Sequence, residues 1–204
     1  MSTVYTKIYD APPVSKKEIL RYAGVRETSD ELLSIVDGCL SEIKDRLSYK
    51  VCYAEFDVTF FDDVIDLGFC VSASKDLRKN LSGCDRLVLF AATVGLEMDR
   101  LIARYSSVSP TKALIFDSIG AERIESLCGE FNREISERAA KMGEIVRPRF
   151  SAGYGDFSID AQKDIFRALN CPKNIGLSLT DSLLMSPSKS VTAIIGISNG
   201  SDKE

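Results

Sequence analysis

The sequence predicts an α+β fold with a mainly antiparallel sheet, because its strand-like and helix-like segments come in mixed order. Two stretches, 51–69 and 176–198, each read as two strands joined by a turn, and such hairpins make antiparallel sheet. A long helical pattern from about 110 to 142 lies between them. We therefore expect a sheet built from hairpins together with one long helix.

Three helix starts in the first part of the chain are marked by a serine or threonine. The segments Ser15-Lys16-Lys17-Glu18 and Thr28-Ser29-Asp30-Glu31 read as capping boxes, with a hydroxyl at the cap and a glutamate three residues later. The second of these helices should extend to about Leu47 on the spacing of its apolar residues. Ser74 is placed to cap a short helix that ends near Leu81.

The middle of the chain predicts a buried strand followed by two helices. The largely apolar run Arg86–Val94 is typical of a buried strand, and Gly95 ends it. A helix over about 96–105 follows. Ser109-Pro110 then marks the start of the long helix, because proline is favoured at the first helical position, and Gly143 ends it.

The last third predicts one helix between strands. A strand near 144–150 leads into a glycine-containing segment, and Asp160 is expected to cap a helix through Leu169. Pro172 is expected to close that helix. Two strands, about 176–184 and 190–198, then complete the pattern.

Length and charge restrict the class of protein. The 204 residues fit a single domain, 1–204, with flexible ends at 1–12 and 199–204. The net charge is −4 and the basic residues are scattered, which disfavours nucleic-acid binding. No apolar run approaches the roughly 20 residues of a membrane helix, and the first residues lack the pattern of a signal peptide. We expect a cytoplasmic protein.

The composition also limits the chemistry. The sequence has six cysteines without a CxxC spacing and no histidine, so we predict no metal site and no catalytic residue of its own. Any reaction must then depend on a bound cofactor. Most of the thiols lie among apolar residues and are expected to be buried and reduced. The cysteines are Cys39, Cys52, Cys70, Cys84, Cys128 and Cys171.

The segment 149–157 is the strongest candidate site. It combines a guanidinium, a phenol, a carboxylate and two glycines within nine residues. Arginine suits a carboxylate or phosphate, and glycine lets a ligand approach the backbone closely. A surface loop in which Arg149 forms an ordinary salt bridge is the alternative. The segment reads Arg149-Phe150-Ser151-Ala152-Gly153-Tyr154-Gly155-Asp156-Phe157.

Two blocks of the sequence resemble a known family. The first is Arg149-x-Ser-x-Gly153-Tyr154, and the second runs from Ile175-Gly176-Leu177 through Met185-x-Pro187 to Ser190-Val191. In this order they resemble the activation domain of cobalamin-dependent methionine synthase, in a short, stand-alone form. Leu89–Gly95 and the helix from Glu125 to Glu134 extend the resemblance.

The resemblance implies a bent, mainly antiparallel sheet flanked by helices. It also implies that S-adenosylmethionine binds in a shallow groove and that the partner is a cobalamin-binding protein or a split methionine synthase. In that family, a flavodoxin-like donor supplies an electron and S-adenosylmethionine supplies the methyl group for reductive activation of cobalt in methionine biosynthesis.

The resemblance also implies the ligand contacts. Arg149 would pair with the ligand carboxylate, and Tyr154 would donate its hydroxyl. Residues Phe150, Ser151, Ala152 and Gly153 would offer backbone groups. We further expect Glu130 or Asp156 to balance the positive charge of the ligand.

The sequence departs from the family in one part of the ligand site. The family contributes an Asp-Trp-Thr-Pro-Phe-Phe element, whereas this chain has no tryptophan. The function therefore stays open between three alternatives. The first is a reactivation subunit that binds S-adenosylmethionine and acts on a separate corrinoid protein. The second is a docking or scaffold protein for a corrinoid methyltransferase that does not bind the ligand. The third is a resemblance in structure only, with a site for another small carboxylate ligand or an unrelated enzyme activity.

Overall fold

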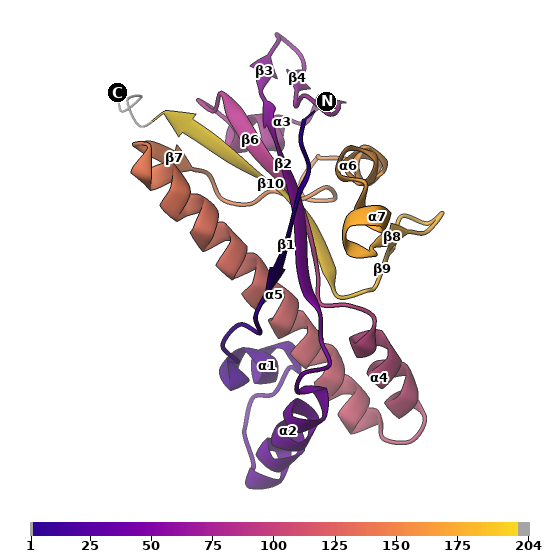
Figure 1. Ribbon diagram of the computed structural model, residues 1–204. Coiled ribbons are helices and arrows are strands. Elements are labelled where there is room, and N and C mark those ends of the chain that lie inside the picture. The colour runs from indigo at the N-terminus through magenta and orange to yellow at the C-terminus, as the bar shows by residue number, and fades with distance from the viewer. Residues whose placement is uncertain (1, 200–204) are drawn as a thin grey trace.

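The fold is built around one five-stranded antiparallel sheet (Figure 1). The computed structural model describes residues 2–199. Its helices lie along both faces of the sheet, so the predicted α+β class with a mainly antiparallel sheet is confirmed. In sheet order the strands are β1 (Tyr5–Tyr9), β2 (Tyr49–Asp57), β6 (Arg86–Thr93), β10 (Ser190–Asn199) and β7 (Glu144–Val146).

The long helix covers one face of the sheet, and two short helices lie on the opposite side (Figure 1). The remaining helices gather around the N-terminal half of the long helix or cover the upper end of the sheet. The helices are α1 (Lys16–Tyr22), α2 (Asp30–Ile43), α3 (Lys75–Asn80), α4 (Glu97–Ser106), α5 (Pro110–Lys141), α6 (Ala161–Leu169) and α7 (Cys171–Ile175).

Strand β6 shows why its sequence is continuously apolar. Alternate side chains of a strand point to opposite faces, and both faces of β6 are covered by helices. Burial on both faces fixes β6 in the centre of the core. Leu87, Leu89 and Ala91 pack with α3, α6 and α7, whereas Val88, Phe90 and Ala92 pack with α5.

Most predicted helix starts are confirmed. The hydroxyls of Ser15 and Ser74 accept hydrogen bonds from the backbone N–H groups three residues later, and Pro110 begins α5. For α2 the capping residue is Ser29, not Thr28. This helix ends at Ile43, four residues earlier than predicted, because the backbone turns into the left-handed region at Asp45 (φ 61°).

The hairpin predicted over 51–69 is confirmed in part of its length. Strands β3 (Thr59–Phe60) and β4 (Ile65–Asp66) pair antiparallel across the turn, and β5 (Val71–Ser72) adds a third strand. The hairpin predicted over 176–198 is wrong. Two short strands, β8 (Ser178–Leu179) and β9 (Met185–Ser186), pair with each other instead.

Strand β10 has distant partners. It pairs with β6 along one edge and with β7 along the other, and both partners precede it by at least forty residues. Almost all of β10 is buried. A strand this apolar needs cover on both faces, which a two-stranded hairpin does not provide.

The predicted flexible N-terminal end is partly ordered as β1. Tyr5–Tyr9 pair with β2 at the edge of the sheet, and the rings of Tyr5 and Tyr53 stack with centroids 5.3 Å apart. The side chains of Lys7 and Tyr9 both donate to Glu134 of α5 at 2.6 Å. These contacts fix residues that carry little apolar pattern. The predicted flexible end at 199–204 lies outside the described residues, apart from Asn199 at the end of β10.

Two further expectations need correction. Strand β7 ends at Val146 rather than near 150, since Pro148 interrupts the backbone pairing. Pro172 does not close α6, because α6 already ends at Leu169, where the next residue, Asn170, takes the left-handed conformation (φ 46°). Pro172 instead lies in the first turn of α7, where its missing N–H is not needed.

Within residues 2–199, no helix combines the length and the apolar character needed to cross a bilayer.

Candidate functional site

The candidate segment follows the outer edge of β10. The N–H of Arg147 donates to the carbonyl of Gly196 at 2.8 Å. Phe150 and Ile194 exchange two backbone hydrogen bonds of 2.9 and 2.8 Å. The chain therefore continues as an interrupted edge strand and holds the following loop against the sheet.

Two glycines shape this loop. Gly153 has φ 92° and donates its N–H to the carbonyl of Phe157 at 2.8 Å, which closes a tight turn. At Gly155 (φ 51°) a Cβ atom would overlap the carboxylate of Asp76 on α3. The glycines therefore serve the turn and the close approach of the loop to α3.

Asp156 fixes the loop to the start of α3. Its carboxylate accepts a short hydrogen bond from the hydroxyl of Ser74 and further bonds from the N–H groups of Lys75 (2.8 Å) and Asp76 (3.2 Å). These hydrogen bonds, that of Ser74 first, hold the pKa of Asp156 below its usual value. The structure thus gives Asp156 a capping role at a helix N-terminus.

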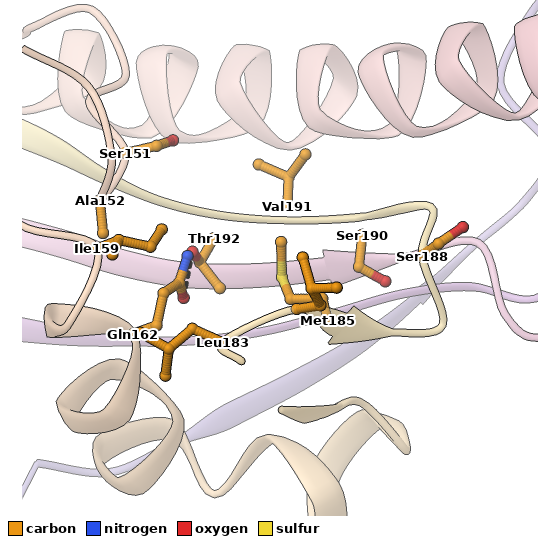
Figure 2. Close-up of a pocket in the computed structure, with 11 residues that line it drawn as sticks. Ser151, Ala152, Ile159, Gln162, Leu183, Met185, Ser188, Ser190, Val191 and Thr192 are labelled. Carbon is orange, nitrogen blue, oxygen red and sulfur yellow. Dashed lines mark hydrogen bonds between the residues drawn. The ribbon is translucent and has the colours of Figure 1, made fainter. Parts of the chain in front are cut away.

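A cavity of about 500 Å³ opens between the loop, α6 and the start of β10 (Figure 2). Ser151 and Ala152 line it from the loop side, and Gln162 lines it from α6. The hydroxyl of Thr192 donates to the side-chain oxygen of Gln162 at 2.9 Å, drawn as the dashed line in Figure 2. Ile159, Leu183, Leu184, Met185, Ser188, Ser190 and Val191 complete the lining.

The lining of this cavity is apolar or uncharged. Its aliphatic and thioether side chains alternate with hydroxyl groups and one amide. The volume lies in the usual range of small-molecule sites, about 300–1,000 Å³. Such a lining suits a flat, weakly polar group such as a nucleobase better than a carboxylate.

Arg149 lies two residues before Ser151 in the sequence, but neither Arg149 nor its partner Glu125 lines this cavity. Arg149 donates to Glu125 of α5 at 3.0 Å, and its side chain is 29% exposed, against 45% for Glu125. Beneath them lies Cys128, which is fully buried, and burial raises the pKa of its thiol to about 12. The pair therefore offers one cationic and one anionic group, whereas the thiol stays protonated at neutral pH.

Glu130 lies apart from this pair. It forms a short ion pair with Arg133, one helical turn farther along α5. The structure thus brings Glu125, not Glu130, to Arg149.

Tyr154 and Phe150 line a different cavity. Their ring centroids are 6.3 Å apart, and Tyr154 is 69% exposed. Both side chains border an open cavity of about 540 Å³ together with Lys79 and Arg147. Arg149 borders neither this cavity nor the one in Figure 2. The predicted pair of Arg149 and Tyr154 is therefore not brought into one cavity in this structure.

The fold has a known counterpart. This chain resembles the MetH reactivation domain. The crystal structure of that domain bound to AdoHcy superposes on this chain with a TM-score of 0.67, and the two chains share 16% sequence identity. The match covers 99% of this chain and 80% of the other. No protein-family model and no curated protein sequence matches the chain. At this identity, the similarity establishes the fold.

Several residues of the site carry no distinctive signal in the sequence. Glu125 stands among other glutamates of α5, and nothing in its spacing marks it as the partner of Arg149. Gln162 is 4% exposed in the first turn of α6, and its burial depends on the arrival of Thr192 from β10. Such contacts between distant segments leave no local pattern. The described residues contain no group of three or more metal-ligating side chains.

Proposed function

We propose that this chain binds S-adenosylmethionine beside the 151–152 loop and presents its methyl group to a cobalamin held by a separate protein. The fold supports this proposal, since it resembles a reactivation domain that binds AdoHcy. One local observation carries it: Arg149, which pairs with Glu125 of α5, stands two residues before Ser151 in the lining of the uncharged cavity.

The two parts of the site match the two parts of the ligand. S-adenosylmethionine has a zwitterionic amino-acid end, a sulfonium that releases the methyl group, and an adenosine. Arg149 would hold the carboxylate with paired N–H groups, and Glu125 would accept from the ammonium. The cavity of Figure 2 would take an uncharged part of the ligand. Binding thus requires the Arg149–Glu125 pair to open and to exchange partners.

The protein contributes position rather than reactive groups. Burial keeps the Cys128 thiol beside Arg149 protonated, and the sequence has no histidine, so we assign no nucleophile or general base to the site. Holding the methyl donor over the cobalt replaces a bimolecular encounter and lowers the activation free energy by several kcal/mol. We propose that residues 1–204 act as one unit in the cytoplasm, with a flavodoxin-like protein as the electron donor.

The ligand claim is tested by titration calorimetry with S-adenosylmethionine. We expect wild-type protein to bind it and Arg149→Ala to bind at least about tenfold more weakly, since a charged hydrogen bond contributes about 1.5–3 kcal/mol. Arg133→Ala is the matched control, because Arg133 pairs with Glu130 on the same helix. Equal affinities of wild type and Arg149→Ala, or no binding by wild type, would contradict the proposal.

One observation favours the alternative of a docking protein that binds no ligand. Arg149 is already engaged by Glu125, and Tyr154 faces another cavity. This alternative predicts that a corrinoid protein is captured equally well with and without S-adenosylmethionine. Capture that strengthens when the ligand is added supports the reactivation function.

A further inference from the structure

Another cavity, of about 450 Å³, lies at the other end of the sheet. The chain that connects β1 to α1 forms one wall, and the end of α2 forms another. Figure 1 shows β1 running down toward α1 and α2, beside α5. This cavity shares no lining residue with the cavity of Figure 2. Its apolar walls include Val14, Leu40, Ile43 and Leu47.

An ion pair with almost no solvent exposure stands beside this cavity, and its arginine, Arg123, contributes to the lining. Arg123 is 1% exposed and Glu122 is 2% exposed. The guanidinium donates to both oxygens of Glu122 at 2.5 and 2.7 Å and to the carbonyls of Pro12 (2.5 Å) and Pro13 (2.7 Å). These bonds occupy four of its five N–H groups. The pair is therefore close to neutral, and it fixes the wall that leads to α1.

Tyr49 supplies the polar group of this cavity. It is 7% exposed, and its phenol contacts Arg123, which also lines the cavity. Burial raises the pKa of Tyr49 even though the positive charge of Arg123 opposes this, so the hydroxyl keeps its proton at neutral pH. Among residues 2–199, none accepts a hydrogen bond from this hydroxyl. Since the guanidinium of Arg123 can only donate, the Tyr49 hydroxyl keeps its own proton available for a ligand.

The charges at the rim decide which ligands fit. Lys44 contributes one positive charge, while Asp10 and Asp45 contribute two negative charges. Because Glu122 neutralises Arg123, the cavity carries no excess of positive charge that would attract an anion. The other phenol of the lining, Tyr9, already donates to Glu134, so Tyr49 is left as the hydroxyl donor of a largely apolar interior. Such an interior selects an uncharged molecule.

We propose that this cavity binds a small, uncharged, largely apolar molecule whose hydrogen-bond acceptor is recognised by the Tyr49 hydroxyl. The Arg123–Glu122 pair holds the wall formed by Pro12 and Pro13, and the apolar side chains of α2 enclose the body of the ligand. The proposal is independent of S-adenosylmethionine binding, since the two cavities share no lining residue.

Three probes of similar size test the proposal on the full chain. Acetophenone carries an acceptor, ethylbenzene lacks one, and benzoate is charged. We expect backbone amide NMR shifts at Asp10, Ala11 and Val14 and at residues 40–49. Acetophenone should bind roughly fivefold more tightly than ethylbenzene, as one neutral hydrogen bond would give. Benzoate should bind most weakly. Equal affinities for acetophenone and ethylbenzene, strongest binding of benzoate, or shifts confined to other residues would overturn the proposal.

Variants separate recognition from folding. Tyr49→Phe should abolish the preference for acetophenone, whereas Tyr53→Phe on the same strand should keep it, because Tyr53 does not line the cavity. Leu40→Trp places a larger side chain in the wall and should weaken both neutral probes at least tenfold. If Tyr49→Phe fails to fold, Leu40→Trp still decides: unchanged binding of both probes in that variant overturns the proposal.

Discussion

Gly120 stands where the long helix is crossed by two other side chains. A Cβ atom at this position would lie 2.8 Å from Cγ of both Lys189 and Met98, and 2.9 Å from Cε of Lys189. Neither neighbour has free space to move into. Met98 is fully buried, and Lys189 is held by Asp117 at 2.7 Å with only 15% of its side chain exposed. Gly120→Ala should therefore overpack this crossing.

The magnitude follows from two opposing effects. Replacing glycine by alanine inside a helix stabilises it by about 0.8–1 kcal/mol. Forcing an extra methyl group into a packed region costs about 1–3 kcal/mol. Gly129 of the same helix is exposed and has no other atom within 4 Å of a Cβ, so Gly129→Ala shows the first effect alone. We expect Gly129→Ala to be the more stable variant by about 1–3 kcal/mol, the cost of overpacking.

Urea unfolding followed by circular dichroism measures this difference directly. We expect Gly129→Ala to unfold at higher urea than wild type, and Gly120→Ala to unfold at equal or lower urea than wild type. If Gly120→Ala gained as much stability as Gly129→Ala, the packing of Lys189 against α5 would be refuted. Since Ser188 and Ser190 flank Lys189 and line the cavity of Figure 2, Gly120→Ala should also weaken ligand binding there.

Three further predictions concern buried and capping groups. Because the pKa of Asp156 is lowered in the folded state, its ionised form stabilises the fold fully above the ordinary aspartate pKa, and this stabilisation is lost as the pH falls through the lower folded pKa. Asp156→Asn should therefore flatten the pH dependence of acid unfolding, measured by circular dichroism. Equal pH dependence in wild type and variant would contradict this. Glu122→Gln leaves Arg123 buried without its counter-charge and should cost about 3–5 kcal/mol in urea unfolding, whereas Glu125→Gln at the exposed pair should cost less than about 1 kcal/mol. Cys128, fully buried with its pKa raised to about 12, should resist iodoacetamide at pH 8 until urea unfolds the protein, as mass spectrometry of the labelled peptide would show; labelling in the folded protein would disagree with its burial.

The sequence was sufficient for elements whose signals are local. Ser15 and Ser74 act as caps within three residues of themselves, and Pro110 sets the backbone at the start of α5. The apolar run of β6 shows burial on both faces. These features depend on residues within one or two helical turns along the chain, so a short stretch of sequence is enough to predict them.

Pairing between distant segments could not be predicted in the same way. Strand β1 is largely exposed and gains its order from β2, at least forty residues later. The segment 176–198 has turn residues that favour a hairpin, yet β10 pairs with β6 and β7. Backbone hydrogen bonding across a sheet is nearly independent of side-chain type, so the apolar pattern alone does not identify the neighbour.

The candidate site likewise combines features that a local pattern predicts with contacts that it does not predict. The segment from Arg149 to Asp156 was found from its composition, but its members separate in space. Arg149 turns to Glu125, Tyr154 borders the cavity beside α3, and Asp156 caps that helix. In a loop with two glycines, successive side chains take directions that no fixed period describes.

The place of β10 in the sheet has a consequence for biosynthesis. Until residue 199 has left the ribosome, β6 and β7 lack the strand that joins them, and the nascent chain exposes the unpaired edge of β6. Ser190 and Thr93, 97 residues apart, must then meet before their hydroxyls can bond. Sheets with such distant strand pairs fold slowly, and an unpaired strand edge can pair with other chains and cause aggregation. We therefore expect newly made molecules to depend on chaperones during this interval.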